Sequence, residues 1–122
     1  MYPYFQKRIL AFKYAFRGIK VLMHETPNSR IHTTLAIMAI ALGFVFRISA
    51  TEWIAICIVI VLVFSMEAIN TAIETLADYS SNKQIDPRIA KLKDLAAAGV
   101  LMAAIAALAV GIIVFLPKII HG

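Results

Sequence analysis

Apolar residues gather in three long stretches of the chain, at about 31–48, 53–79 and 95–116. A helix needs about 20 apolar residues to cross a hydrocarbon core about 30 Å thick. The first stretch is short for this purpose, unless the polar turn at residues 32–34 extends it. The pattern predicts three membrane-crossing helices, and therefore an all-α membrane protein.

The residues before the first stretch show the pattern of an amphipathic helix over about 3–24. Apolar residues recur at spacings of four and three, and basic residues occupy most of the remaining positions. The apolar positions are Phe5, Ile9, Phe12, Phe16, Ile19 and Met23; the basic positions are Lys7, Arg8, Lys13, Arg17 and Lys20. Such a helix lies flat on a membrane, with its cations toward the headgroups. It is either an anchor only, or an anchor whose cations also meet a polyphosphate.

The helix is expected to end at the segment 25–29. Pro27 disfavours helical geometry at Thr26, the residue before it. Asn28 or Ser29 is expected to cap the membrane helix that follows.

Composition supports a single membrane domain over residues 1–122. The chain is 61% hydrophobic and 16% charged, with a mean hydropathy of +0.84, which is too apolar for a soluble domain. A globule of this size has no interior large enough to bury such stretches. The single cysteine, Cys57, excludes an intrachain disulfide.

The net charge of +5 is explained by membrane topology rather than by a nucleic-acid partner. Six basic residues precede the first apolar stretch and four lie between the second and third, while only Arg47 and Lys118 fall on the opposite side. Loops rich in Lys and Arg stay in the cytoplasm. We therefore expect a cytoplasmic N-terminus, a cytoplasmic loop at 79–93, an external C-terminus and no nucleic-acid partner.

Three polar residues form a stripe on the second membrane helix. Glu67, Asn70 and Glu74 share one face of a helix with 3.6 residues per turn. A carboxylate at the centre of a membrane helix costs about 2.5–3.5 kcal/mol on insertion scales, so it usually has a function. The alternative is a pair of carboxylates near the helix end that are merely solvated.

A short polar loop with the turn signal Asp86-Pro87 leads into the third stretch through Lys93 and Asp94. Small residues follow at high density from residue 96 onward, and they let helices approach closely in lipid. Because antiparallel neighbours joined by a short loop pack together, we expect Lys93 and Asp94 to lie against the polar stripe.

Carboxylates beside cations suit Mg²⁺ bound to a nucleoside triphosphate. A carboxylate in a dehydrated setting also suits a general base, and lysine or arginine offsets charge on a transferred phosphoryl group. The sequence has no glycine-rich phosphate loop and no zinc-type cluster. Residue chemistry alone leaves a proton or cation translocator open, whereas an inert scaffold leaves the stripe unexplained.

The motif Glu-x-x-Asn-x-x-x-Glu at 67–74, with Asp78 and then Lys93-Asp94-Leu95-Ala96-Ala97, resembles a known family. This family comprises the small bacterial integral-membrane lipid kinases, the diacylglycerol kinase and undecaprenol kinase group. Segments 12–19 and 28–32 also resemble it, and 52–53 and 115–118 look like its undecaprenol-kinase branch. The resemblance covers essentially the whole chain.

The resemblance implies a surface helix and three membrane helices, assembled in the cell (inner or plasma) membrane as a homotrimer with active sites shared between subunits. It implies phosphorylation of a lipid alcohol, undecaprenol or diacylglycerol, with MgATP as the phosphoryl donor.

The resemblance also implies roles for single residues. Glu67 is the expected general base, and Glu74 the expected Mg²⁺ ligand. Asn70 is expected to orient the groups beside them. The residues expected to engage the nucleotide are Lys7, Tyr14, Lys93 and Asp94.

One position departs from the family pattern. The second metal-binding glutamate of the family falls at position 26, where this chain has Thr26. The nearest acid is Glu25, one residue earlier. We expect Glu25 to act as a displaced metal ligand.

Overall fold

The computed structural model describes residues 3–82 and 84–121, and it folds them into four helices. These are α1 (Tyr4–Glu25), α2 (Pro27–Val45), α3 (Ala50–Ser81) and α4 (Pro87–His121). Three of them, α2 to α4, are long and apolar enough to cross a membrane. The expected architecture of one surface helix and three membrane helices is confirmed.

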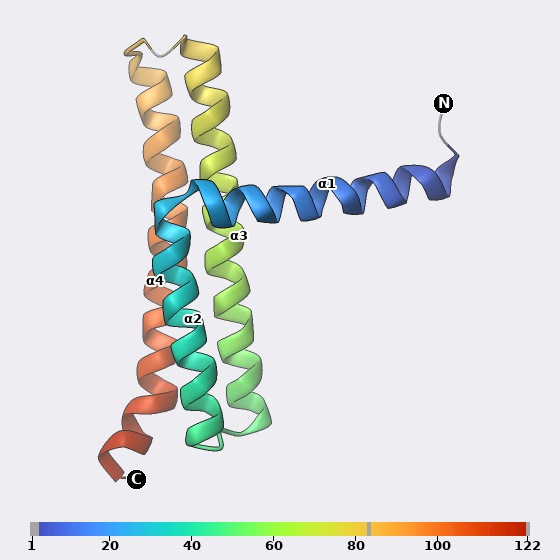
Figure 1. Cartoon of the computed structure of the whole chain (residues 1–122). Helices are drawn as coiled ribbons and strands as arrows, with labels where there is room; N and C mark the ends of the chain where they lie inside the picture. The colour runs from blue at the N-terminus through green and yellow to red at the C-terminus, as the bar shows by residue number, and fades with distance from the viewer. Residues whose placement is uncertain (1–2, 83, 122) are drawn as a thin grey trace.

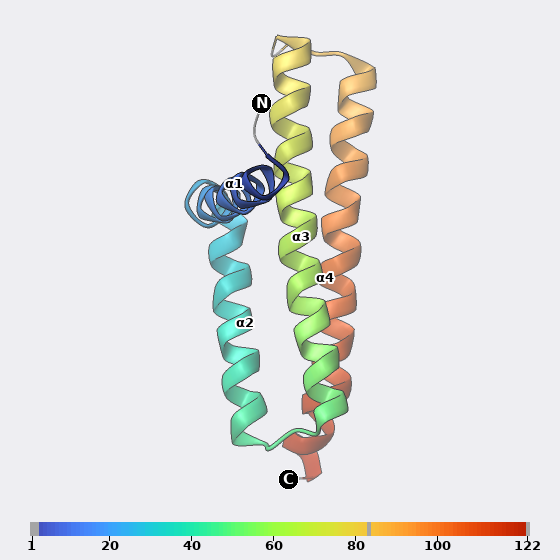
Figure 2. The ribbon, with the colours of Figure 1, turned by 90° about the vertical axis from the view of Figure 1, so that its right-hand side faces the viewer.

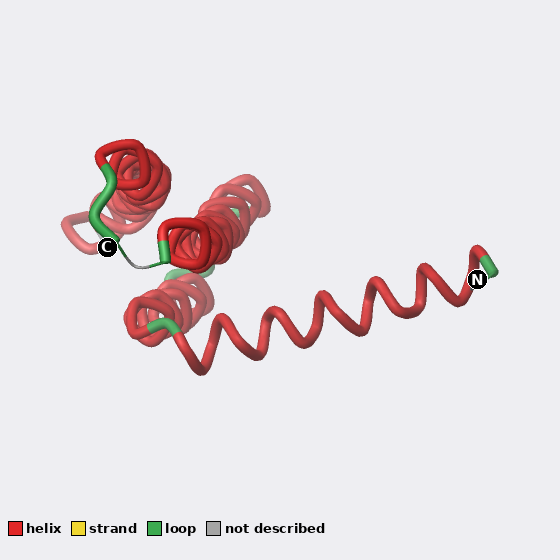
Figure 3. Tube along the Cα trace, turned by 90° about the horizontal axis from the view of Figure 1, so that it is seen from above, coloured by secondary structure: helices red, strands yellow, loops and turns green. Residues whose placement is uncertain are grey.

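The three membrane helices lie side by side, and α1 leaves them almost at a right angle (Figures 1 and 3). The most extensive packing joins α3 to α4, and α2 packs mainly on α3 (Figure 2). The apolar side chains of α1 point into open space, with Phe5 78% and Phe16 69% exposed. A face of this kind needs lipid or another protein surface to cover it.

The membrane helices differ in length. At 1.5 Å per residue, the 19 residues of α2 span about 28 Å, close to the thickness of a hydrocarbon core. The 32 residues of α3 and the 35 of α4 span about 48 and 52 Å. Both therefore continue past the level of α1, toward the loop that joins them (Figure 1).

We name each end of the bundle after the connection that it carries. The loop end carries the α3–α4 connection at residues 82–86, and the turn end carries the α2–α3 connection at residues 46–49. The helix α1 joins the bundle at the start of α2, between the two ends and nearer to the loop end (Figure 1).

The corner between α1 and α2 differs from the expected one. The helix α2 begins at Pro27 with Thr26 in its N-cap position, so the prediction that Asn28 or Ser29 caps it is wrong. Proline suits the first helical position because the N–H that it lacks has no helical partner there. The buried Thr26 hydroxyl donates to the Leu22 carbonyl, and the Ser29 hydroxyl donates to the Thr26 carbonyl at 2.7 Å.

The helix α4 extends beyond the apolar stretch at both ends. It begins at Pro87, where the Asp86 carboxylate accepts the backbone N–H of Arg88 at 2.9 Å and caps the first turn. This bond, followed by the Arg88 guanidinium, holds the pKa of the Asp86 carboxyl below its usual value. The helix also continues through Pro117, and Figure 1 shows its last turns bent away. A proline inside a helix removes one hydrogen bond and kinks the axis.

The turn end is tightly built. Ser49 and Glu52 form a capping box: the Ser49 hydroxyl accepts the Glu52 N–H at 3.2 Å, and the Glu52 carboxylate accepts the Ser49 N–H at 2.9 Å. The second carboxylate oxygen of Glu52 accepts a hydrogen bond from Lys118 Nζ at 2.9 Å, which ties α3 to α4. A Cβ on Gly43 would lie 2.6 Å from the Trp53 ring, so only glycine lets the two helices approach this closely.

Candidate functional site

The expected polar stripe is a continuous row on α3 that runs from the interior to the surface. Glu67 and Asn70 are buried, 3% and 8% exposed, and Glu74 is exposed. Asn70 Nδ2 donates to Glu74 Oε1 at 3.4 Å. The carboxylate of Glu67 is therefore not merely solvated, and the buried amide of Asn70 bonds to the exposed end of the row.

A histidine from α2, which the sequence analysis did not single out, faces the buried end of this row. His32 Nε2 lies 3.7 Å from Glu67 Oε2, near enough for an ion pair but too far for a hydrogen bond. The His32 ring also meets Phe64 edge-on, with 6.1 Å between the ring centroids.

Within the described residues, three buried polar atoms in this region have no hydrogen-bond partner: His32 Nε2, Glu67 Oε2 and Asn70 Oδ1. Leaving a buried polar atom unpaired costs about 1–3 kcal/mol. Two of them, His32 Nε2 and Glu67 Oε2, face each other at 3.7 Å, and unpaired buried groups of this kind need an explanation in the function or the packing of the protein.

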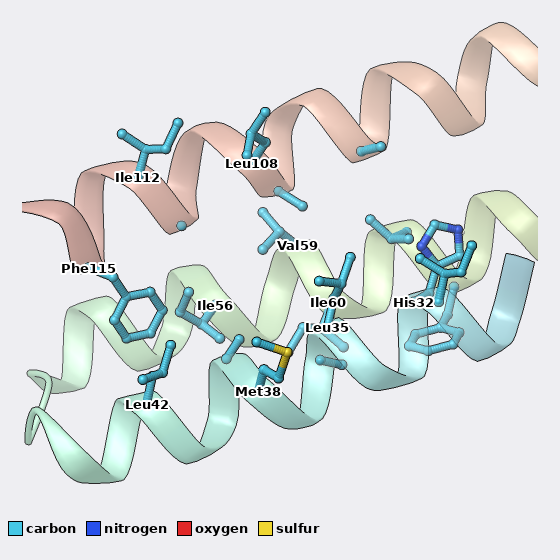
Figure 4. A pocket seen from close by; sticks show the side chains of 18 residues that line it. His32, Leu35, Met38, Leu42, Ile56, Val59, Ile60, Leu108, Ile112 and Phe115 are labelled. Atoms are coloured by element: carbon cyan, nitrogen blue, oxygen red, sulfur yellow. The ribbon is translucent and has the colours of Figure 1, made fainter.

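An apolar cavity of about 380 Å³ adjoins His32. Side chains from α2, α3 and α4 line it, and it extends from His32 toward Leu42 and Phe115 at the turn end (Figure 4). Apart from His32, every lining residue is apolar or glycine. His32 therefore stands between an apolar cavity inside the membrane bundle and the buried carboxylate of Glu67.

Lys93 lies one helical turn farther toward the loop end than the expected position beside the stripe. Its ammonium group donates to Asp78 Oδ1 at 2.5 Å, and Asp78 follows Glu74 by four residues on α3. Asp94 is exposed next to Lys93 on α4. The α3–α4 hairpin thus brings charged groups together next to the polar stripe, on its loop-end side.

The structure does not bring Lys7 and Tyr14 to the stripe of their own chain. They precede Glu25 by 18 and 11 residues, about 27 and 17 Å along α1. The helix points away from the bundle over this length (Figure 3). The Arg17 guanidinium instead lies over the Tyr14 ring, 5.6 Å from the ring centroid.

The donor set at this end of the bundle suits a Mg²⁺–nucleotide complex better than a metal held by protein alone. Among the described residues, no three His, Cys, Asp or Glu side chains come together to hold a metal ion. Mg²⁺ typically uses one or two carboxylates and completes its shell with phosphates and water. Glu74 offers an exposed carboxylate of this kind. Glu25 is exposed at the end of α1, whereas the Thr26 hydroxyl is already bonded to Leu22.

Comparison with known proteins agrees with these observations. Residues 13–115 match the family described as prokaryotic diacylglycerol kinase. The chain is 34% identical over 109 residues to an undecaprenol kinase of Bacillus subtilis, covering 89% of this chain and 88% of that protein. It is 30% identical over 112 residues to a diacylglycerol kinase of Synechocystis sp., covering 92% of this chain and 64% of that protein.

Proposed function

Since the chain belongs to the prokaryotic diacylglycerol kinase family and is a membrane lipid kinase, we propose that it transfers the γ-phosphoryl group of MgATP to undecaprenol or diacylglycerol. The observation that carries this proposal is the position of Glu67. Its buried carboxylate has one oxygen unpaired among the described residues and lies 3.7 Å from His32, which lines a membrane-embedded apolar cavity. A lipid whose hydrocarbon chain occupies that cavity would present its hydroxyl to this carboxylate.

In the proposed reaction Glu67 acts as the general base. The lipid hydroxyl oxygen forms a bond to the γ-phosphorus, the bond from that phosphorus to the β–γ bridging oxygen breaks, and the hydroxyl proton moves to Glu67. The products are a lipid monophosphate and ADP. The hydrogen bond between Asn70 and Glu74 supports a role for Asn70 in orienting the exposed carboxylate.

We assign the exposed end of the row to the metal and the nucleotide. Glu74 would hold Mg²⁺, with Glu25 as a second carboxylate, and the bound ion offsets charge on the phosphates. Lys93 and Asp94 would engage the nucleotide. The ion pair between Lys93 and Asp78 supports this, because it keeps the ammonium near the stripe before a phosphate replaces its partner.

We propose that the site is completed by α1 of another copy in a homotrimer. Two features support this proposal: the part of α1 that carries Lys7 and Tyr14 extends away from the bundle of its own chain (Figure 3), and the apolar face of α1 is exposed. The basic residues around the loop end favour a cytoplasmic orientation in the cell membrane, where MgATP is available.

A second candidate, a proton or cation translocator, is favoured by the same buried carboxylate. It would need further polar groups along α3 toward the turn end. Residues 53–64 of α3 carry none apart from Trp53 and the thiol of Cys57, and the Glu52 carboxylate is occupied by Ser49 and Lys118. The kinase is therefore the better supported function.

The test is phosphorylation by purified protein in detergent, with undecaprenol and diacylglycerol offered in parallel and labelled γ-phosphate followed into lipid. We expect label in at least one lipid, dependent on Mg²⁺. Absence of label from both lipids, in a preparation that is folded and monodisperse, would contradict the proposal.

A further inference from the structure

We propose that His32 is a positioning residue for Glu67: its Nε2–H donates to Glu67 Oε2 and holds the other carboxylate oxygen toward the lipid hydroxyl. This inference rests on the proposed function, in which Glu67 accepts the hydroxyl proton. Its basis is the buried approach of these two side chains, which belong to different helices.

The surroundings of His32 and Glu67 favour a contact between these two side chains. The side chains of His32 and Glu67 are 15% and 4% exposed, and neither Nε2 nor Oε2 has another partner among the described residues. The His32 ring also meets the Phe64 ring on α3, and His32 lines the apolar cavity together with residues of α2 and α4 such as Leu35 and Ala104. No second charged group from these elements lines the cavity beside His32 within the described part of the chain.

The fold fixes the depth of His32 relative to Glu67. At the turn end Gly43 is pressed against Trp53, which sets the register of α2 against α3. His32 lies eleven residues before Gly43, and Phe64 lies eleven residues after Trp53. Equal distances along antiparallel helices give equal depth, so His32 and Phe64 must meet. The Glu67 side chain, one turn farther, leans back toward the helix N-terminus and so toward His32.

The present distance of 3.7 Å suits a bond that forms fully only in the reacting complex. Catalytic hydrogen bonds are often long in the absence of substrate and shorten when it binds. A hydrogen bond from an imidazole N–H to an ionised carboxylate is charge-assisted, and it restricts rotation of the carboxylate. Loss of this donor leaves a buried base that is free to turn away from the hydroxyl.

Two substitutions at position 32 separate hydrogen bonding from packing. His32→Gln keeps an N–H donor at similar reach, whereas His32→Leu fills the space without a donor. A hydrogen bond to a charged group contributes enough for a change of about 10–100-fold. We therefore expect His32→Leu to lower kcat by about 10–100-fold, with an unchanged KM for MgATP, and His32→Gln to stay within about threefold of wild type.

Two controls accompany these variants. Thr34→Val removes a polar group from the same stretch of α2, but Thr34 is exposed and bonds to its own helix at Arg30, so activity should be unchanged. In a Glu67→Gln background, His32→Leu should cause no further loss, because the role of His32 acts through Glu67. If His32→Leu is not monodisperse in detergent, His32→Met replaces it as the apolar variant.

Wild-type activity in the apolar variant would overturn the inference. Equal losses in His32→Gln and His32→Leu would also overturn it, because they would show that shape rather than the N–H matters. Absence of lipid phosphorylation by the wild type, or full activity of Glu67→Gln, would instead contradict the proposed function on which the inference rests.

Discussion

Two glutamates of α3 show opposite environments within one helix. Glu52, at the turn end, accepts hydrogen bonds from the Ser49 N–H and from Lys118 Nζ. Glu67, fifteen residues farther along, is 3% exposed and has an oxygen without a hydrogen-bond partner among the described residues. The more accessible carboxylate is fully engaged, and the more deeply buried one is not.

This contrast distinguishes a carboxylate that stabilises the fold from one to which we assign a role in the reaction. The partners of Glu52 cap α3 and tie it to α4, so this carboxylate stabilises the fold. Glu67 has no such partner in hydrogen-bond contact: His32 lies 3.7 Å from Oε2, and we assign the other oxygen to the lipid hydroxyl. The carboxylate at the turn end ties the helices together, whereas we propose that the polar row of α3 takes part in the reaction.

The largest expected effect comes from Glu67→Gln. The amide keeps the size of the side chain and removes the base, and general bases contribute about 10²–10⁴-fold to rate. We expect kcat for lipid phosphorylation to fall by this factor while nucleotide affinity is largely kept. The matched control is Glu52→Gln at the paired carboxylate, which should retain turnover. If the kcat of Glu67→Gln stays within about threefold of the wild-type value, Glu67 is not the general base.

The next effect is expected at the exposed end of the row. Glu74→Gln should raise the Mg²⁺ concentration needed for half-maximal activity by about tenfold or more, because a neutral amide is a poorer Mg²⁺ ligand than a carboxylate. High Mg²⁺ or Mn²⁺ should restore part of the activity. A metal titration identical to that of wild type would show that Glu74 does not bind the ion.

At the turn end the expected effect is on stability rather than on turnover. A methyl group on Gly43 would meet the Trp53 ring at 2.6 Å, and overpacking of this kind costs about 1–3 kcal/mol. Gly43→Ala should therefore lower the thermal unfolding midpoint in detergent. Gly111→Ala on α4, where the added carbon meets nothing within 4 Å, is the matched control. Equal midpoints for the two variants would refute the close approach of α2 and α3.

The smallest expected effect tests the displaced acid. If Glu25 is a metal ligand, Glu25→Ala should raise the Mg²⁺ requirement several-fold, less than Glu74→Gln, because Mg²⁺ readily takes water in place of one carboxylate. The exchange Glu25→Thr with Thr26→Glu should then retain or improve activity. A Mg²⁺ titration of Glu25→Ala that overlays wild type would leave Glu25 as a solvated carboxylate at a helix end.

The sequence predicted the number, order and kind of the helices because apolar periodicity is a local signal. It did not predict where the helices end. The helix α4 gains two polar turns from Pro87, where Asp86 caps it, and it passes through Pro117. Such ends depend on caps and packing rather than on hydropathy.

For the site, helical spacing was enough to place Glu67, Asn70 and Glu74 on one face, because all three lie on one helix. Contacts between helices were harder to predict, because they depend on how far each helix is shifted along its neighbour. The pairs Lys93 with Asp78 and His32 with Glu67 join different helices, so the spacing of residues along one helix does not predict them. Counting equal distances from the helix ends at each connection pairs His32 with Val63 and Asp78 with Ala90, about one helical turn short of Glu67 and Lys93, so counting alone would not have found either pair.

The central claim, that this chain phosphorylates a lipid alcohol, is tested most directly in proteoliposomes supplied with MgATP. ADP, labelled lipid phosphate and ion flux are measured together, with and without undecaprenol or diacylglycerol. The account predicts equal amounts of ADP and lipid phosphate, both dependent on the added alcohol, and no flux above that of empty vesicles. Ion flux without ATP turnover would contradict it and favour a translocator.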